Sequence, residues 1–371
     1  MNAPHPLPTH YGLLLFLCMA GLWALWWFML GAQHSARRRT LRQRIQALEL
    51  PTDAAFHAAV AATESAALQM RDTLLRRAPL RGLHHPLYDL PWLLFIGGED
   101  GGLPALLAAA PRDAGPAHET GAAPAYWRWH LLPAMVAIEA SADADEEAAA
   151  PRSRGLWLHA LLALADQRER LPLNGMVVCI SAAGLLANDE RLAADARQLR
   201  QRIEEAAGLL QLHLPVYLLV TGLERLPGYA VLRAALPAPA RAQALGHRFR
   251  LPEGVPATGR FDALFDALFE PLIQRLHALR MGLLRVEPDP ARRQAIHVFI
   301  EQLRALQPGL RRAAQHLFGP APTHAHPHAQ TRTQVRWRGL YLVAGPTQED
   351  EATFIQDLFQ RFLPADQPLA R

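Results

Sequence analysis

Residues 90–104 read Leu-Pro-Trp-Leu-Leu-Phe-Ile-Gly-Gly-Glu-Asp-Gly-Gly-Leu-Pro, and this stretch decides the fold class. Its first seven residues form a short apolar run that stops at glycines, which is typical of a strand buried on both faces. Residues 103–110 follow with the pattern of a helix. A buried strand, a glycine-rich turn and a helix, in this order, are the setting in which phosphate-binding loops occur.

The glycine-rich turn keeps the spacing of a phosphate-binding loop but lacks its reactive side chains. Four residues separate Gly97 from Gly102, as the pattern requires. The next two positions hold Leu103 and Pro104, where a working loop has a lysine for the phosphates and a serine or threonine for magnesium. The chain contains no lysine anywhere, since all 38 basic residues are arginine. This composition also excludes a catalytic lysine or a Schiff base.

Two acidic residues in the turn act against phosphate binding as well. Glu99 and Asp100 place carboxylates where a polyphosphate would lie. Two like charges about 4 Å apart repel by ~4 kcal/mol at an effective dielectric constant near 20. We therefore predict that the turn is vestigial and binds neither a nucleoside triphosphate nor another cofactor.

Strands and helices alternate after this turn. We expect one or two strands in 127–138, and further strands at 176–180 and 216–221, with helices at 155–168 and 189–210 between them. Such alternation favours a parallel sheet in a three-layer α/β domain, which we place at residues 85–255.

The region 256–371 changes character and reads as a helical subdomain with a terminal strand and helix. The expected elements are helices at 259–285, 289–305 and 307–318, a strand near 335–343 and a helix near 349–362. Between them, His324, His326 and His328 alternate in a Pro/His loop without a cysteine or a carboxylate. We interpret them as solvated and predict no metal site.

The amino-terminal region predicts a single transmembrane helix. Residues 11–31 carry no charge over 21 positions, which is roughly 31 Å of helix and matches a hydrocarbon core. The apolar stretch is too long for the core of a signal peptide. Five arginines follow it and residues 1–10 contain none, which places the amino terminus outside and the bulk of the chain in the cytoplasm. These arginines are Arg37, Arg38, Arg39, Arg42 and Arg44. We therefore assign residues 1–35 to a short periplasmic amino terminus and the transmembrane helix. Residues 36–84 are assigned to two juxtamembrane helices.

The net charge and the two cysteines indicate which partners and which cellular compartment to expect. The formal charge of +4 is mild and does not indicate a nucleic-acid partner. Cys18 and Cys179 have no partner at disulfide or zinc spacing, which fits a reducing compartment.

Five short blocks in order carry a family resemblance. They are residues 90–92 (Leu-Pro-Trp), 170–175 (Arg-Leu-Pro-Leu-Asn-Gly), 214–221 (beginning Leu-Pro-Val-Tyr), 226–229 (Leu-Pro-Gly-Tyr) and 338–341 (Arg-Gly-Leu-Tyr), the last followed by Gly345 and Gln348-Glu349. This order resembles the cytoplasmic region of the IcmF/TssM family, the large inner-membrane subunits of type VI and related type IV secretion systems. The resemblance covers about residues 85–360.

The resemblance implies a P-loop-NTPase-like sheet whose three nucleotide motifs are all degraded. The family's Walker A lysine falls at Leu103, its Asp-Thr-Ala-Gly motif at residues 139–142 and its Thr-Lys-Cys-Asp motif at residues 221–224. Glu139, Thr221 and Glu224 keep polar or acidic character, whereas Gly222 replaces the lysine that stacks on the base. We therefore expect a pseudo-NTPase and not an enzyme.

What the resemblance implies for function is a structural role. We expect a scaffold component or accessory of a type VI secretion membrane complex, single-pass in the inner membrane of a Gram-negative bacterium, with a periplasmic amino terminus. The implied partners are a TssL-like membrane subunit and baseplate proteins. Two alternatives stay open: a GTP- or ATP-binding switch with unusual motifs, and a truncated regulator or decoy of a full-length TssM, since the chain ends at Arg371, where the family continues into a further span.

Overall fold

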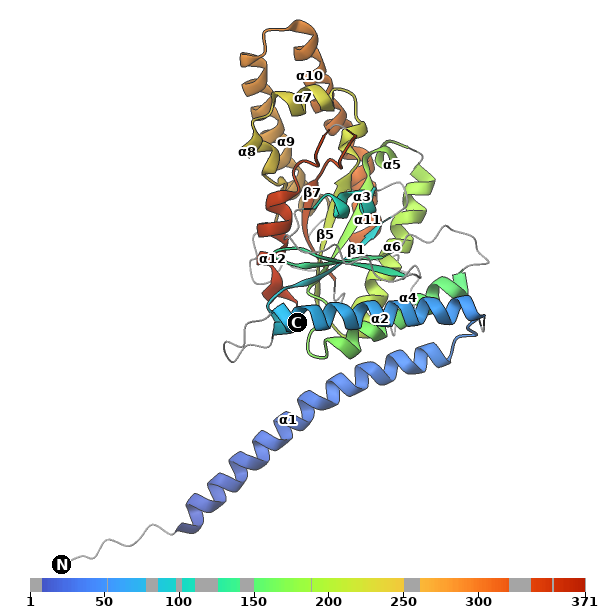
Figure 1. Ribbon diagram of the computed structural model, residues 1–371. Coiled ribbons are helices and arrows are strands. Elements are labelled where there is room, and N and C mark those ends of the chain that lie inside the picture. Colours follow the sequence, from blue (N-terminus) through green and yellow to red (C-terminus); the bar gives the residue numbers. More distant parts are fainter. Residues whose placement is uncertain are drawn as a thin grey trace, which may run out of the picture.

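The computed structural model describes residues 9–51, 53–77, 86–97, 102–110, 126–140, 150–187, 189–249, 261–319, 335–348 and 350–370. They form a mixed α/β fold around one seven-stranded sheet (Figure 1). The strands are β1 (Trp92–Gly97), β2 (Trp127–Leu131), β3 (Val136–Ala140), β4 (Gly175–Ser181), β5 (Leu214–Thr221), β6 (Leu245–Arg248) and β7 (Val335–Leu342).

The order across the sheet is β2-β3-β1-β4-β5-β7-β6. The five inner strands β3, β1, β4, β5 and β7 run parallel, and the two edge strands are antiparallel to their neighbours. The inner strands β1, β3, β4 and β5 are buried along nearly their whole length. Both faces of a parallel sheet are covered by helices, so its strands appear as continuous apolar runs in the sequence.

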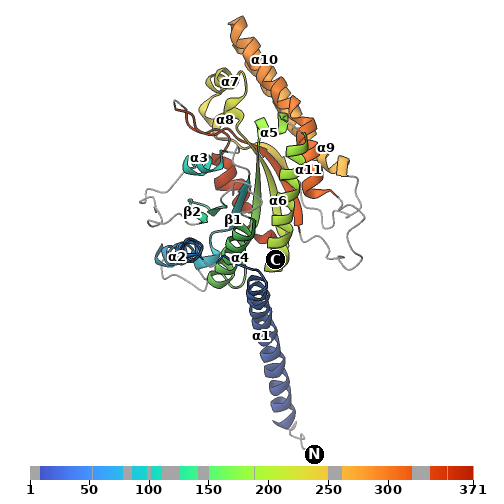
Figure 2. The ribbon, with the colours of Figure 1, turned by 90° about the vertical axis from the view of Figure 1, so that its right-hand side faces the viewer.

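The helices surround this sheet and extend beyond it. They are α1 (Thr9–Gln46), α2 (Ala54–Arg77), α3 (Leu103–Ala108), α4 (Ala150–Gln167), α5 (Ala182–Leu186), α6 (Asp189–Leu210), α7 (Tyr229–Ala235), α8 (Ala238–Ala242), α9 (Phe261–Val286), α10 (Pro290–Ala305) and α11 (Gln307–Phe318), followed by a π-helical turn (Leu358–Phe362) and α12 (Leu363–Ala365). Helices α9 and α10 form a hairpin that projects from the end of the molecule opposite α1 (Figures 1 and 2).

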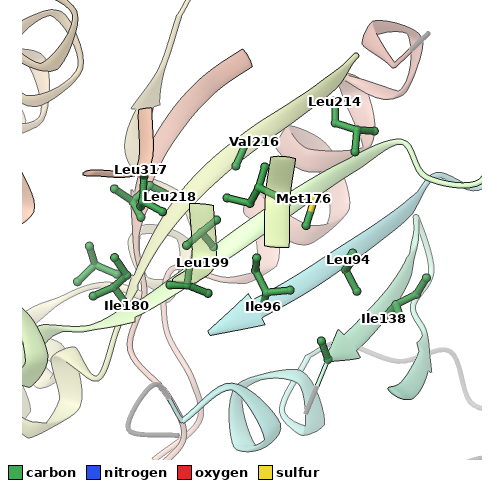
Figure 3. Close-up of a cluster of buried hydrophobic side chains, with 14 of the residues drawn as sticks. Leu94, Ile96, Ile138, Met176, Ile180, Leu199, Leu214, Val216, Leu218 and Leu317 are labelled. Carbon is green, nitrogen blue, oxygen red and sulfur yellow. The ribbon is translucent and has the colours of Figure 1, made fainter. Parts of the chain in front are cut away.

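Alternate residues of the strands divide the core between the two faces of the sheet. Leu94 and Ile96 of β1 point to the same face as Val216 of β5, where Leu199 of α6 and Leu317 of α11 meet them (Figure 3). The other face packs against α3 and the carboxyl-terminal helical segment, through a cluster of buried side chains that includes Leu93, Phe95, Leu106, Val177 and Phe359. This spacing of two residues follows from the pleat of a strand.

The amino-terminal helix differs from the sequence-based expectation. The predicted span 11–31 and the predicted helix 37–48 belong to one continuous helix, α1. Among the residues that the structure describes, no helix combines the length and hydropathy needed to cross a membrane. Several side chains of 11–31 lie outside the described part of the chain. The transmembrane helix is therefore not confirmed.

The carboxyl-terminal elements also differ. The strand that we grouped with the helical region is β7, and it lies inside the sheet between β5 and β6. The final helix begins at residue 356 and not near 349. Before it, the described residues 343–348 and 350–355 are outside any helix, and a bridge joins Ala344 to Thr353. Strand β6 and the short helices α5, α7 and α8 had no counterpart in the sequence analysis.

Candidate functional site

The carboxyl ends of the parallel strands β1, β3, β4, β5 and β7 meet at one edge of the sheet, beside the start of α3. This edge is where α/β proteins bind ligands. The sequence-predicted positions Gly97, Gly102, Leu103, Glu139, Thr221 and Glu224 all lie at the ends of these strands or in the segments that follow them. The fold therefore brings the degraded motifs to one edge of the sheet, where their contacts can be compared.

The two spaced glycines have structural reasons of their own. A Cβ atom on Gly97 would lie 2.7 Å from the carbonyl oxygen of Cys179 on the paired strand β4. Gly102 caps α3 with φ at +58°, a left-handed conformation that favours glycine. The glycine spacing of a phosphate loop is thus explained by strand packing and helix capping.

Replacing Gly97 with alanine is expected to lower the free energy of unfolding by about 1–3 kcal/mol, because the added methyl group has no space between β1 and β4. Urea-induced unfolding, monitored by circular dichroism, measures this change in the free energy of unfolding. Gly282→Ala is the matched control, since nothing lies within 4 Å of its Cβ position. An unchanged midpoint for Gly97→Ala would contradict the packing role.

Leu103, where the family resemblance implied the Walker A position, is part of the core. Its side chain is 4% exposed and belongs to the cluster between the sheet, α3 and the carboxyl-terminal segment. Pro104 lies in the first turn of α3 and is exposed. Glu99 and Asp100 lie outside the described residues. The helix therefore presents an apolar side chain to the core at a position where a phosphate loop presents a cation to its ligand.

Glu139, at the end of β3, is 4% exposed and has partners on the neighbouring strand. Its Oε2 atom lies 2.8 Å from Nε2 of His130, and Nη1 of Arg128 lies 3.4 Å from Oε1. Burial raises the pKa of the nearby Cys179 thiol, and the Glu139 charge raises it further. The thiol stays protonated and unreactive, and the carboxylate is engaged by β2. Residues 141 and 142, which complete this motif, lie outside the described part of the chain.

Thr221 and Glu224 connect strand ends to each other. The Thr221 hydroxyl donates to the carbonyl oxygen of Ile180 at 3.4 Å. Glu224 Oε2 accepts a 2.7 Å hydrogen bond from the backbone N–H of Gly345. These contacts join the end of β5 to β4 and to the turn after β7. The acidic residue in the position of the base-recognition motif therefore has a structural partner within the chain.

Metal ligation receives no support in the described residues, where no group of three or more His, Cys, Asp or Glu side chains could hold an ion. His324, His326 and His328 lie outside those residues. The described edge holds the buried side chain of Leu103, the partnered carboxylates of Glu139 and Glu224, and the start of α3 at Gly102. This arrangement stabilises the sheet edge, and we find no nucleophile with an activated partner among these groups.

The sequence analysis did not predict a buried arginine that links two of the five blocks. Arg168, which is fully buried after α4, donates from Nη1 to Asn174 Oδ1 at 2.6 Å and from Nη2 to the Leu90 carbonyl at 3.3 Å. Its guanidinium lies 4.8 Å from the ring centre of Tyr88 and 5.1 Å from that of Trp92. Burial lowers the pKa of Arg168 to about 10. The blocks at 90–92 and 170–175 thus meet around one cation.

A second cluster links two further blocks to the carboxyl-terminal turn. Asp366, 6% exposed, accepts hydrogen bonds from Arg338 of β7 and from the Tyr217 hydroxyl of β5. Although burial disfavours the Arg338 charge, its hydrogen bonds to Asp366 raise its pKa. Burial, and then the Asp366 charge, raise the pKa of Tyr217. The blocks at 214–221 and 338–341 therefore also mark a structural contact.

The basic segment after residue 36 contacts the main domain. Arg37 is 6% exposed and donates to the carbonyl oxygen of Glu169 at 3.2 Å. Arg38 pairs with Glu169 and, at 3.3 Å, with Asp166. Leu41 is fully buried in the core. The carboxyl-terminal part of α1 is thus fixed to the end of α4, where the helix carbonyls favour a nearby cation.

The comparisons with known proteins agree with the blocks. The model of the IcmF-related N-terminal domain matches residues 150–371 of the chain. The chain belongs to the IcmF/TssM family. Type VI secretion system component TssM1 of Pseudomonas aeruginosa is 33% identical over 286 residues, which are 74% of this chain and 25% of TssM1. This IcmF/TssM chain therefore spans about a quarter of the length of that relative.

Solved structures add little to the family assignment. A crystal structure of SsGBP with GDP matches 43% of this IcmF/TssM chain and 41% of its own length, at 9% identity and a TM-score of 0.24. A variant of the same protein matches at the same identity and TM-score, with 45% and 46% covered. Similarity at this level supports no inference about the ligand or the fold of the IcmF/TssM chain.

Proposed function

We propose that this chain is a structural component or accessory of a type VI secretion membrane complex and does not hydrolyse nucleotides. The observation that carries the proposal is the burial of Leu103 in the core, in a chain of the IcmF/TssM family that contains no lysine. The 33% identity to TssM1 supports the secretion system as the setting.

The electrostatics of the strand ends support the structural role. A phosphate-binding edge needs cations and free backbone donors aimed at the ligand. Here Glu224 accepts the backbone N–H of Gly345, and Glu139 contacts Arg128 and His130. Each carboxylate therefore has a partner inside the chain. Hydrolysis would also need a residue that positions the attacking water and a residue that binds magnesium. In the account proposed here, the three motif segments of this chain lack both residues.

The arrangement of α1 suggests how the chain is mounted. We place residues 11–31 in the inner membrane, with a periplasmic amino terminus and a cytoplasmic domain, because five arginines follow this apolar stretch. Because α1 continues to Gln46 and Leu41 is buried in the core, the anchor and the domain form one unit. A continuous helix of this kind would hold the domain in a fixed position relative to the membrane, as a scaffold requires.

Partners follow from the same reasoning. We propose a TssL-like membrane subunit and baseplate proteins as the neighbours of the cytoplasmic domain, held by complementary surfaces without a chemical step. The α9–α10 hairpin lies at the end of the molecule opposite α1 and would face away from the membrane (Figures 1 and 2). It is therefore the part of the domain that would extend furthest toward baseplate proteins.

Co-purification tests the proposed assembly role. The tagged full chain is extracted from membranes in mild detergent, and the TssL-like subunit of the same secretion system is followed by immunoblot. We expect its recovery with this chain and not with a tagged single-pass membrane protein of unrelated function. Failure to recover any subunit of the secretion complex, with both proteins expressed, would contradict the role.

A further inference from the structure

The amino-terminal half of α1 carries apolar side chains in solvent. Leu14, Leu15, Phe16 and Leu22 are between 62% and 73% exposed. This half of the helix projects away from the sheet and its covering helices (Figures 1 and 2). Exposed apolar surface of this extent marks a contact with another protein or with lipid. The membrane placement proposed above assigns it to the acyl chains of the bilayer.

The stretch of α1 that follows, residues 35–46, is basic and holds no acidic residue. The first acidic residue of the whole chain is Glu49. Two arginines of this stretch are engaged by the domain, since Arg37 donates to the Glu169 carbonyl oxygen and Arg38 pairs with two carboxylates at the end of α4. Both of those carboxylates are therefore already paired.

The other three arginines of this stretch are exposed. Arg39, Arg42 and Arg44 form no ion pair with the residues that the structure describes. Leu41, between them in the sequence, is fully buried against the domain. Because successive residues of a helix are turned by about 100°, the three arginines project from different sides of α1. A helix that leaves a bilayer is surrounded by headgroups on every side that the domain does not cover, so these arginines need not share one face.

The position of these arginines along α1 matches the depth of lipid headgroups. Arg39 and Arg44 follow Gly31, the end of the uncharged stretch, by about 12 and about 20 Å of helix. The polar layer of a bilayer extends roughly 5–8 Å beyond its hydrocarbon core on each side. A long arginine side chain can extend back toward this layer, and electrostatic attraction acts over a further ~8 Å at physiological ionic strength. All three arginines are thus within electrostatic reach of the lipid phosphates.

We propose that Arg39, Arg42 and Arg44 bind the phosphate groups of anionic phospholipids at the cytoplasmic face of the membrane. A guanidinium group pairs with phosphate through two parallel hydrogen bonds and keeps its charge at any physiological pH. This lipid contact rests on the membrane placement proposed above, and it adds a lasting role to charges that otherwise only orient the chain during insertion. Because Arg37 and Leu41 fix the same helix to the domain, bound lipid would hold the domain against the membrane surface.

Native mass spectrometry of the full chain in mild detergent tests this contact, with phosphatidylglycerol and phosphatidylcholine of identical acyl chains added at equal concentration. Phosphatidylcholine carries the same phosphate next to a compensating ammonium group, so it has no net charge. We expect phosphatidylglycerol adducts to exceed phosphatidylcholine adducts on the order of tenfold, since each arginine near an anionic surface raises the affinity roughly fivefold. Higher ionic strength should reduce the difference.

A pair of charge-matched variants locates the contact on the chain. The preference for phosphatidylglycerol should disappear in the triple variant Arg39→Gln, Arg42→Gln and Arg44→Gln. It should persist in the control, which removes the same charge from exposed positions on α6, α9 and α10 through Arg197→Gln, Arg285→Gln and Arg293→Gln. Equal adducts of the two lipids on the wild-type chain, or a preference that the first triple variant retains, would overturn the proposal.

Two further measurements separate the lipid contact from a free-phosphate site and from the membrane placement. Glycerophosphoglycerol, the headgroup without acyl chains, should not displace phosphatidylglycerol at the same concentration, because it cannot contact the apolar half of α1. Displacement would indicate a site for free phosphate esters and would overturn the lipid contact. Flotation of the full chain with phosphatidylcholine vesicles tests the placement itself. Flotation together with equal lipid adducts would refute the lipid contact alone, whereas a chain that does not float would refute both.

Discussion

Replacing Asp366 with alanine is expected to lower the free energy of unfolding by about 3–5 kcal/mol, the usual cost of leaving one partner of a buried ion pair without the other. Asp366 accepts hydrogen bonds from Nε and Nη2 of Arg338 at 2.7 and 2.9 Å. It also accepts the Tyr217 hydroxyl at 2.7 Å and Nη1 of Arg248 at 3.3 Å. Without the carboxylate, the Arg338 charge is buried without a counter-ion.

Urea titration of the full chain in detergent measures this loss. Asp357→Ala is the matched control in the same segment, because Asp357 pairs at 3.8 Å with Arg361, whose side chain is 76% exposed. Such an exposed pair contributes at most about 1 kcal/mol. Equal midpoints for Asp366→Ala and Asp357→Ala would show that the carboxyl-terminal turn is not fixed to β5 and β7 by this cluster.

Replacing Leu103 with lysine is expected to destabilise the protein by about 3–5 kcal/mol, because an unpaired charge would enter the apolar cluster between α3 and the sheet. If the position instead faced a phosphate site, lysine would be tolerated there and would restore part of the Walker A motif. The substitution therefore distinguishes a core position from a ligand-binding one.

Thermal and urea unfolding of Leu103→Lys measure this effect, with Ala105→Lys as the matched control. Ala105 lies two residues further along α3 and is exposed. The control should stay within about 0.5 kcal/mol of the wild type, as most surface substitutions do. Equal stability of the two lysine variants would contradict the core assignment of Leu103.

Much of the sheet could be predicted from local patterns. Strands β1, β4 and β5 are continuous apolar runs because both faces of the sheet are covered, and α6 coincides with the predicted helix 189–210 because its amphipathic pattern is uniform. β7 has an equally clear strand pattern, but its pairing with β5 spans more than a hundred residues. No local signal indicates which sheet such a strand joins.

For the candidate site too, some features are visible in the sequence and others required the structure. The residues that the family resemblance aligns with the nucleotide motifs, Leu103 and Gly222, can be read from the sequence. The hydrogen-bond partners of the acidic residues cannot be read from the sequence, since Glu224 and its partner Gly345 are 121 residues apart. Similarly, the five blocks indicated the family, whereas the contacts of Arg168 and Asp366 that explain four of them required the structure.

The amino-terminal arginines make a contact that the charge pattern did not predict. Their excess after residue 36 predicted the topology of a membrane anchor. The structure shows that Arg37 and Arg38 contact the end of α4. Arg39 and Arg42, in contrast, are exposed. Charge patterns alone could not separate the residues that contact the domain from those that remain at the surface.

Equilibrium binding of fluorescent GTP and ATP analogues to the full chain in detergent, with and without magnesium, tests the central claim most directly. The account predicts no saturable binding of either nucleotide, because a buried leucine and internally paired carboxylates occupy the positions that a phosphate site needs. Magnesium-dependent binding with micromolar affinity would contradict it.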